Sequence, residues 1–273
     1  MRHRRIKQLF TATAAAAYLA AAATLVVTGH TALRYSADHD DTLPLWAAWA
    51  PVLGGLAIAW LVPPATSGRA QPSGANESVT VRQASGLFAL GLTFTVALYL
   101  SPGDDLWFIG LKLALLLVVP LLLRLASWHE WYRVDTHRRW LRAIPAVLTF
   151  VALASLLGPG FTGRPPAPVT ILVVFLVNAV LEEVFYRIWL QTRLEAICGR
   201  WPAIMSTALL WASWHVALHG GAGFAIDLAT VVVRLGVDGL FLGYLWSRYR
   251  NPWLLFVVHG LINAPITMLM SMA

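Results

Sequence analysis

The feature that most constrains this chain is a series of nine apolar runs, most of them close to bilayer-spanning length. About 20 helical residues cross the hydrocarbon core of a membrane, and the runs recur along the whole 273-residue sequence. The chain is 58% hydrophobic and only 12% charged, whereas a soluble domain carries about 25% charged residues. We therefore expect an all-α, polytopic transmembrane helical bundle of about nine spans. The runs lie at Phe10–Ala32, Leu43–Val62, Ala84–Leu100, Leu106–Leu125, Ile144–Leu157, Val169–Leu190, Ala203–Leu218, Ala225–Trp246 and Trp253–Met270.

The basic residues indicate how these spans are oriented. Cytoplasmic loops of membrane proteins carry an excess of Lys and Arg. With the N-terminus inside, only Arg34 and Arg164 fall in outer loops, and Lys112 and Arg234 lie within spans. We therefore predict a cytoplasmic N-terminus and an external C-terminus. The basic residues on the cytoplasmic side would be Arg2, Arg4, Arg5, Lys7, Arg69, Arg82, Arg124, Arg133, Arg138, Arg139, Arg142, Arg187, Arg193, Arg200, Arg248 and Arg250.

No long soluble domain interrupts the apolar runs. The stretch Pro63–Asn76 contains Pro, Gly and Ser and predicts a loop, and Ser127–Arg142 mixes Trp with Arg and His as an interfacial amphipathic helix does. We therefore expect about four spans in residues 1–126, an interfacial segment at 127–143 and a functional core at 144–273.

Charge and cysteine content exclude other classes. The net charge is +7, but the basic residues are spread in short stretches between apolar runs and form no single patch. We therefore expect the lipid bilayer, and no nucleic acid, as a partner. Cys198 is the single cysteine, which rules out an intrachain disulfide and a Cys-based metal site. The basic N-terminus before a long apolar run predicts an uncleaved signal anchor. The Ala-rich, Lys-poor composition favours a bacterial inner-membrane protein.

Ionisable residues inside spans are functional candidates, because their burial in lipid is costly. Lys112 is expected to reach the outer surface near Asp104 and Asp105, a structural role. Arg234 and Asp238 are four residues apart on one helix face and can form an ion pair. Together with Asp227 they are either a structural stripe or one wall of a substrate cavity. Gly239 and Gly243, on the same predicted helix, favour close helix contact.

The sixth run ends in two adjacent glutamates. Glu183 and Arg187 are four residues apart and can pair on one helix face. Glu182 points about 100° away from that face, so it lacks this partner. A carboxyl group in a water-filled cavity suits a general base. The alternative is that Arg187 neutralises both glutamates in a purely structural role.

Two later runs contribute imidazoles and an amide. The seventh carries His215 four residues after Trp211, and the ninth carries His259 four residues before Asn263. A single buried histidine is often structural, but two of them with Asn263 and two glutamates suggest a site. Helix rise places Glu182, His215, His259 and Asn263 in one layer of the cytoplasmic half of the bilayer.

These three motifs resemble the CPBP family of intramembrane proteases. Glu-Glu-x-x-x-Arg, aromatic-x-x-x-His and His-x-x-x-Asn follow one another on separate late helices over about residues 165–270. The family includes CAAX prenyl endopeptidases and bacterial proteins of the lysostaphin-resistance and bacteriocin-immunity type. Its second motif usually begins with Phe, where this chain has Trp211, which we interpret as a change of packing residue.

The resemblance implies a role for each residue. Glu182 and His215 would activate a water molecule for attack on a peptide carbonyl, and His259 and Asn263 would hold the oxyanion. Glu183 and Arg187 would support Glu182. The implied partner is a membrane-bound protein or peptide substrate, such as a bacteriocin leader or an anchored C-terminal segment.

Two alternatives remain open at this point. His215 and His219 have zincin-like spacing, but no Glu follows His215. We favour a metal-free mechanism with no cofactor, with zinc as the alternative. The second alternative is a non-enzymatic transporter or immunity-type factor that uses the same polar pocket for binding.

Overall fold

The structure of the chain is a computed structural model that describes residues 2–36, 39–62, 77–101, 103–130, 138–159, 161, 166–218 and 221–272. Each of the nine predicted apolar runs contains a helix, and the predicted all-helical membrane bundle is confirmed. The helices are α1 (Arg2–Val27), α2 (Leu45–Leu61), α3 (Glu77–Leu100), α4 (Asp105–Leu113), α5 (Val119–Leu122), α6 (Ile144–Leu157), α7 (Pro168–Val174), α8 (Thr192–Cys198), α9 (Arg200–Ser213), α10 (Phe224–Tyr249), α11 (Pro252–Asn263) and α12 (Ile266–Met270).

Several of these helices continue into turns of different pitch. Turns with π geometry join α4 to α5 and interrupt the long helix from α7 to α8, and a 3₁₀ turn extends α9. The π-helical segments are η1 (Ala114–Val118), η4 (Phe175–Val180) and η5 (Glu183–Gln191), and the 3₁₀ turns are η2 (Trp128–Glu130), η3 (Arg138–Ala143) and η6 (Trp214–Ala217).

Five helices of the described chain are long and apolar enough to cross a membrane. They lie at Gln8–Val27, Ser78–Leu100, Asp105–Leu122, Trp140–Leu157 and Pro168–Cys198, while α2 and α11 are shorter apolar helices. The chain is therefore an integral membrane protein. The total of nine spans and the orientation of the bundle remain predictions.

The structure corrects the ends of two predicted spans. The first helix ends at Val27, and an antiparallel hairpin of β1 (Ala32–Ser36) and β2 (His39–Pro44) leads into α2. It is the one sheet among the described residues. At the other end of the chain the helix breaks after Asn263 and resumes at Ile266. Pro265 explains the break, since proline has no N–H and disfavours helical geometry in the residue before it.

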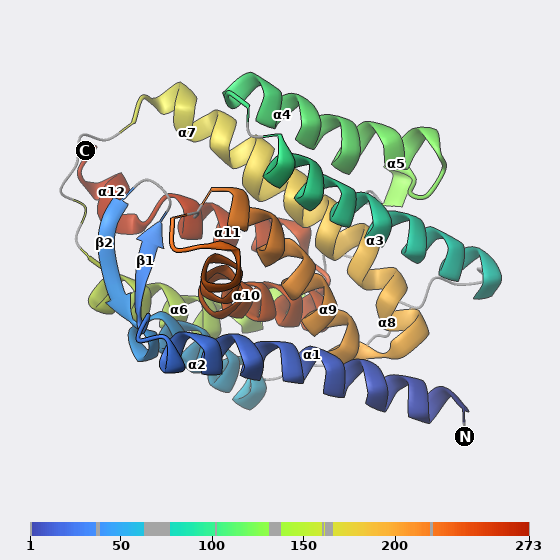
Figure 1. Ribbon diagram of the computed structural model, residues 1–273, viewed down its shortest axis with the longest axis horizontal. Coiled ribbons are helices and arrows are strands. Elements are labelled where there is room, and N and C mark those ends of the chain that lie inside the picture. Colours follow the sequence, from blue (N-terminus) through green and yellow to red (C-terminus); the bar gives the residue numbers. More distant parts are fainter. Residues whose placement is uncertain are drawn as a thin grey trace.

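Helix α10 lies at the centre of the bundle and is seen nearly end-on in Figure 1. It packs against α1, α2, α9 and α11, and Tyr18 of α1 donates a hydrogen bond to its Gly236 carbonyl at 2.9 Å. Most of its residues are buried, as expected for a helix enclosed on several sides. The predicted close contact at Gly239 and Gly243 is confirmed: a Cβ at these positions would lie 2.9 Å from Ala208 and from Gln191, respectively.

The predicted interfacial segment is attached to the bundle by a charged clamp. Its described parts are η2 and η3, while residues 131–137 and the predicted loop Pro63–Asn76 lie outside the described residues. Both guanidinium ends of Arg193 on α8 bind the Glu130 carboxylate, at 2.9 and 3.0 Å. A bidentate pair of this kind fixes the geometry of both partners.

Candidate active site

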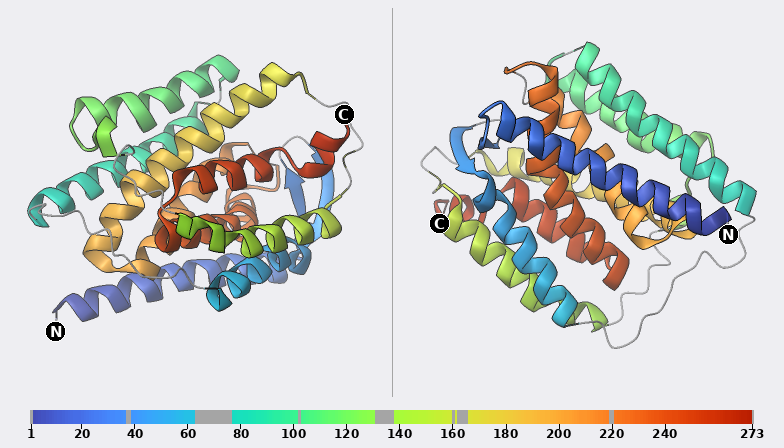
Figure 2. Two further views of the ribbon diagram at one scale, coloured as in Figure 1. Left: turned by 180° about the vertical axis from the view of Figure 1, so that it is seen from behind. Right: turned by 60° about the horizontal axis from the view of Figure 1, so that its bottom comes forward.

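The two glutamates of the first motif lie where a long helix changes its pitch. The rod from α7 through α8 has π-helical turns on both sides of Leu181 and Glu182, and Glu183 begins the second turn. Such π turns occur mostly as local insertions in α-helices and are frequent at functional sites. Figure 2 shows this rod passing through the bundle, close to α9 and α11.

Glu183 contacts two partners. Its Oε2 lies 3.4 Å from Arg187 Nε, which confirms the predicted i,i+4 pair. Its Oε1 lies 2.8 Å from His259 Nδ1 on α11, a contact that local spacing did not indicate. All three side chains are buried. Glu183 therefore fixes the orientation of the His259 ring in addition to balancing the charge of Arg187.

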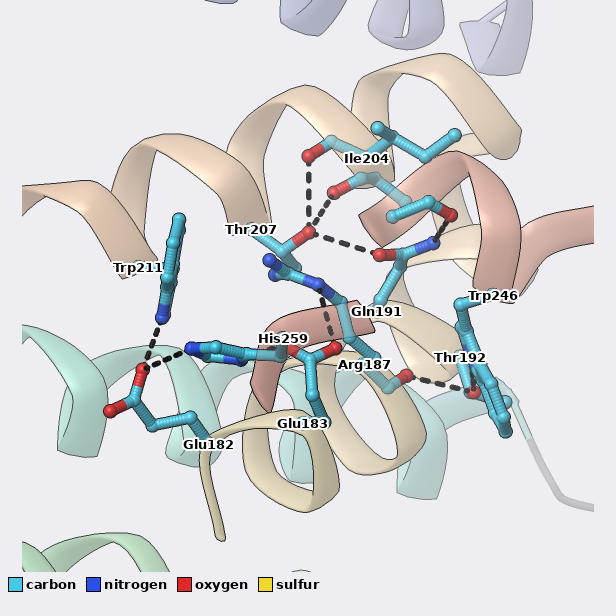
Figure 3. A network of polar contacts seen from close by, with 12 residues as sticks. Glu182, Glu183, Arg187, Gln191, Thr192, Ile204, Thr207, Trp211, Trp246 and His259 are labelled. Carbon is cyan, nitrogen blue, oxygen red and sulfur yellow. Dashed lines mark hydrogen bonds and ion pairs between the residues drawn. The ribbon is translucent and has the colours of Figure 1, made fainter. Parts of the chain in front are cut away.

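Glu182 has partners of its own, which local spacing did not indicate. Lys112 of α4 forms an ion pair with Glu182 Oε1, and the Trp211 indole N–H donates to Oε2. Glu182 is only 1% exposed, so it is closed off in this structure and not open to a water-filled cavity. Its Oε2 lies 4.0 Å from His259 Nε2. Figure 3 shows Glu182 between Trp211 and His259.

His259 therefore lies between the two carboxylates. Its Nδ1 faces Glu183 and its Nε2 faces Glu182, while the Trp211 ring meets it edge-on at a centroid distance of 5.4 Å. A neutral His259 that donates its Nδ1–H to Glu183 presents an unprotonated Nε2 to Glu182. A protonated His259 presents an N–H donor there instead.

His215 and Asn263 lie near this cluster in different ways. His215 is in the 3₁₀ turn η6, stacked on Trp214 at 3.7 Å between ring centroids and 5.1 Å from the Trp211 ring. Its Nδ1 lies 3.1 Å from the Trp211 carbonyl oxygen. Asn263 is the last residue of α11, one turn beyond His259, and its side chain is exposed. The structure thus brings Glu182, Glu183, Arg187 and His259 together, places His215 beside them, and leaves Asn263 at the rim.

A second polar layer supports the rod one turn beyond Arg187. Gln191 donates to the Gly243 carbonyl of α10 at 2.8 Å, and its Oε1 accepts from Thr207 of α9 at 3.4 Å. Figure 3 shows this layer beside the glutamate cluster. Because Gly243 has no side chain, α10 can approach Gln191 closely. This contact fixes the rotation of the rod that carries both glutamates.

The charged stripe on α10 is largely used in structural contacts. Arg234 and Asp238 form the predicted ion pair at 2.6 Å, and both residues line a pocket between α2, α6, α10 and the end of α11. The Asp227 carboxylate accepts hydrogen bonds from the backbone N–H groups of Gly221 and Ala222. Asp227 therefore holds the loop before α10 in place.

Sequence reasoning missed the part that two residues have in the site, Lys112 and Trp211. The sequence predicts that Lys112 reaches towards Asp104 and Asp105, but in the structure it binds Glu182 and Asn178, whereas Asp104 caps α4. The sequence predicts a packing residue at Trp211, yet its indole N–H donates a hydrogen bond to Glu182. The one sequence signal for Lys112 is its position as the sole charged residue between Leu106 and Leu123, inside the fourth apolar run. Nothing in the spacing could connect it to Glu182, 70 residues later.

A metal site was the open alternative. Within the described ranges, no group of three or more His, Cys, Asp or Glu side chains is arranged to hold a metal ion. His219, which completed the zincin-like spacing, lies outside the described residues.

A comparison with known protein families matches the segment that contains Glu182, Glu183, Arg187 and His259. Residues 164–265 match the model of a family described as type II CAAX prenyl endopeptidase Rce1-like. The segment is similar to this family, and we refer to it as the Rce1-like domain. The resemblance expected from the three motifs is confirmed, and the family indicates a protease that acts within the membrane. No curated protein and no solved structure matches the chain. Helices α1 to α6 lie outside the matched segment.

Proposed function

We propose that this protein is an intramembrane endopeptidase in which Glu182 activates water for hydrolysis of a peptide bond. The observation that carries the proposal is the arrangement around His259: Glu183 binds one ring nitrogen and Glu182 faces the other, within the Rce1-like domain. A carboxylate and an oriented imidazole are a suitable pair for general acid–base catalysis.

The proton transfers follow from this geometry. Glu182 removes a proton from water as the water oxygen attacks the peptide carbonyl carbon, and the carbonyl oxygen becomes an oxyanion. The protonated Glu182 then gives its proton to the amide nitrogen, and the oxyanion collapses to a carbonyl as the C–N bond breaks, which releases a carboxylic acid and an amine. His259, held by Glu183, donates to the oxyanion in its protonated form. Preorganised donors of this kind stabilise an oxyanion most in a dry site.

His215 and Asn263 complete the proposed machinery. His215 lies beside Trp211, whose N–H binds Glu182, and is proposed to assist water activation. Asn263 lies one turn from His259 on the same helix, where an amide N–H can be a second oxyanion donor. Because Asn263 is exposed and His259 is buried, we propose that the scissile bond enters from the Asn263 end of α11.

Binding of the substrate requires an opening of the site. Glu182, Glu183 and His259 are each at most 1% exposed, so neither water nor a peptide reaches them in this conformation. Apo enzymes often have catalytic groups in a closed or poorly aligned arrangement that changes when substrate binds. The substrate is proposed to be a membrane-anchored protein or peptide of the bacterial inner membrane, cleaved without a metal cofactor.

The test is peptide cleavage by the purified protein and matched variants. The substrates are a farnesylated peptide ending in a CAAX sequence, the same peptide without the lipid, and peptides from anchored C-terminal segments, all in phospholipid vesicles. Glu182→Gln should abolish cleavage. Because it also leaves the buried Lys112 without its counter-charge, circular dichroism measures how much of the variant is folded, and cleavage is compared per folded molecule. The control is Glu130→Gln, which alters the glutamate that pairs with Arg193 and should retain cleavage.

Glu183→Gln provides the second comparison. It should lower the stability to unfolding by about 3–5 kcal/mol, because it leaves a buried Arg187 without its counter-charge. Thermal unfolding of the purified variants measures this effect. Wild-type function that survives in Glu182→Gln would instead support a non-enzymatic binding protein. Activity that tracks stoichiometric zinc during chelation and re-addition would overturn the metal-free proposal.

A further inference from the structure

The contact that the proposed chemistry leaves unexplained is the ion pair between Glu182 and Lys112. Lys112 belongs to α4, outside the Rce1-like domain, and its side chain is fully buried. Its ammonium group also donates to Asn178 Oδ1 at 2.6 Å. Asn178 and Glu182 are one helical turn apart, so Lys112 contacts two residues on one face of the rod.

Aromatic rings enclose the Lys112 ammonium group on its other sides. It lies 4.7 Å from the centroid of the Phe108 ring and 4.5 Å from that of Trp214. An ammonium group at this distance from an aromatic face is attracted by the ring electrons. Trp214 in turn stacks on His215. Lys112 thus contacts Glu182 directly, and the Trp214 ring lies between Lys112 and His215.

The local backbone matches this arrangement. The π turn η1 begins two residues after Lys112, and π turns lie on both sides of Glu182. Both helices therefore depart from α-helical pitch close to the point where they bring the pair together. Such insertions change the direction of nearby side chains and are frequent at functional sites.

The charges of the buried residues show what the ion pair between Lys112 and Glu182 does. The buried cluster contains two cations, Lys112 and Arg187, and two carboxylates, Glu182 and Glu183. Glu183 lies beside Arg187, so Lys112 is the counter-charge of Glu182. A carboxylate without a nearby cation in this setting would favour its protonated form, and a protonated Glu182 cannot remove a proton from water.

We propose that Lys112 is a positioning residue of the peptidase site, which holds Glu182 in place as a carboxylate. This proposal rests on the role of Glu182 in the proposed function. It assigns a part to the N-terminal spans, because α4 supplies the cation that completes a site otherwise built from the Rce1-like domain. Lys112 itself does not contact the substrate, so its loss should change kcat and leave KM nearly unchanged.

The experiment compares Lys112→Gln and Lys112→Met with Lys112→Arg in the full-length protein, with the peptide that the wild type cleaves. In a plot of kcat against pH, the fall in kcat on the acid side (the acid limb) should move to higher pH by about 1–3 pH units in the neutral variants, because Glu182 loses the cation that favours its carboxylate form. Lys112→Arg, which keeps the charge, should retain the wild-type limb. Arg250→Met, which removes the cation paired with Glu195, is the control for general loss of an ion pair and should not move the limb.

A shift of the pH profile can be attributed to Lys112 only if the variants leave the other ionisable groups near Glu182 in place. None of the variants alters the other ionisable side chains around the cluster, which are Glu183, Tyr186, Arg187, His215, Asp238 and His259. A limb that stays at the wild-type pH in Lys112→Gln, with kcat reduced only by the loss of folded protein, would overturn the proposal. Higher activity in Lys112→Gln would also overturn it, since Lys112 would then restrain the base.

A second measurement does not depend on turnover. The infrared difference between Lys112→Gln and Lys112→Gln/Glu182→Gln should contain the carbonyl band of a protonated carboxylic acid at neutral pH. The difference between wild type and Glu182→Gln should lack it. Absence of the band in both differences would overturn the role of Lys112 even if no substrate is cleaved. Failure of the proposed peptidase is recognised separately, by equal behaviour of wild type and Glu182→Gln towards every peptide.

Discussion

At the scale of single residues, the surroundings of Glu182 and Glu183 separate two side chains that are adjacent in the sequence. Glu183 binds Arg187 and His259, and both contacts fix positions. Glu182 faces Lys112, Trp211 and the second ring nitrogen of His259. The helix rotates by about 100° per residue, which directs the two carboxylates to different neighbours. Each carboxylate therefore has its own counter-charge, Arg187 for Glu183 and Lys112 for Glu182, and each faces a different nitrogen of the His259 ring.

The hydrogen bond from Trp211 to Glu182 gives a residue-scale prediction. Trp211→Phe keeps an aromatic ring but removes the N–H donor, and a hydrogen bond to a charged group contributes about 1.5–3 kcal/mol. The variant should lose about that much stability in thermal or denaturant unfolding. The control is Trp189→Phe, because Trp189 is equally buried and its N–H makes no hydrogen bond within the described part of the chain. Equal losses in the two variants would show that ring volume, and not the donor, is what matters.

The residues that could be predicted from the sequence are those related by local spacing. Glu183 with Arg187, and Arg234 with Asp238, are each four residues apart, and helix geometry alone brings them together. Lys112 with Glu182, and Glu183 with His259, are joined by the packing of separate helices. No periodicity in the sequence encodes those contacts. They required the arrangement of α4, the α7–α8 rod and α11 in space.

At the scale of elements, the apolar runs predicted where helices lie better than where they end. Each run contains a helix because its backbone can satisfy its hydrogen bonds internally in lipid. The ends depend on finer chemistry, such as Pro265 after α11 and the hairpin after α1. The π turns around Glu182 were not predicted, because no residue pattern marks a five-residue hydrogen-bond register.

The close contact between α9 and α10 gives an element-scale prediction. A Cβ at Gly239 would lie 2.9 Å from Ala208 Cβ and 3.0 Å from Trp211 Cε3. Gly239→Ala should therefore push α9 away, cost about 1–3 kcal/mol of stability and move Trp211 away from Glu182. Gly110→Ala is the matched control, since nothing lies within 4 Å of its added Cβ. Thermal unfolding and peptide cleavage measure both variants, and a Gly239→Ala protein as stable and active as Gly110→Ala would contradict the packing argument.

At the scale of the whole molecule, the bundle combines the Rce1-like domain with the helices that precede it in the sequence. The Rce1-like domain supplies both glutamates, Trp211 and His259, while the N-terminal helices surround it and contribute Lys112. Tyr18 of α1 and Trp49 of α2 both donate hydrogen bonds to carbonyl oxygens of α10. The N-terminal helices are therefore attached to the central helix of the domain through its backbone, in addition to the contact at Glu182.

The orientation of the molecule is the last prediction. Figures 1 and 2 show the two termini at opposite ends of the bundle, as expected for an odd number of crossings. The excess of Lys and Arg in the loops on the N-terminal side favours a cytoplasmic N-terminus. A reporter that is active only outside the cytoplasm should therefore give signal when fused after Ala273 and remain silent when fused after Arg250. A cytoplasm-dependent reporter at the same two sites is the control and should give the opposite pattern. Signal from the outer reporter at Arg250, with silence at Ala273, would reverse the orientation and place the Asn263 end of α11 on the cytoplasmic side.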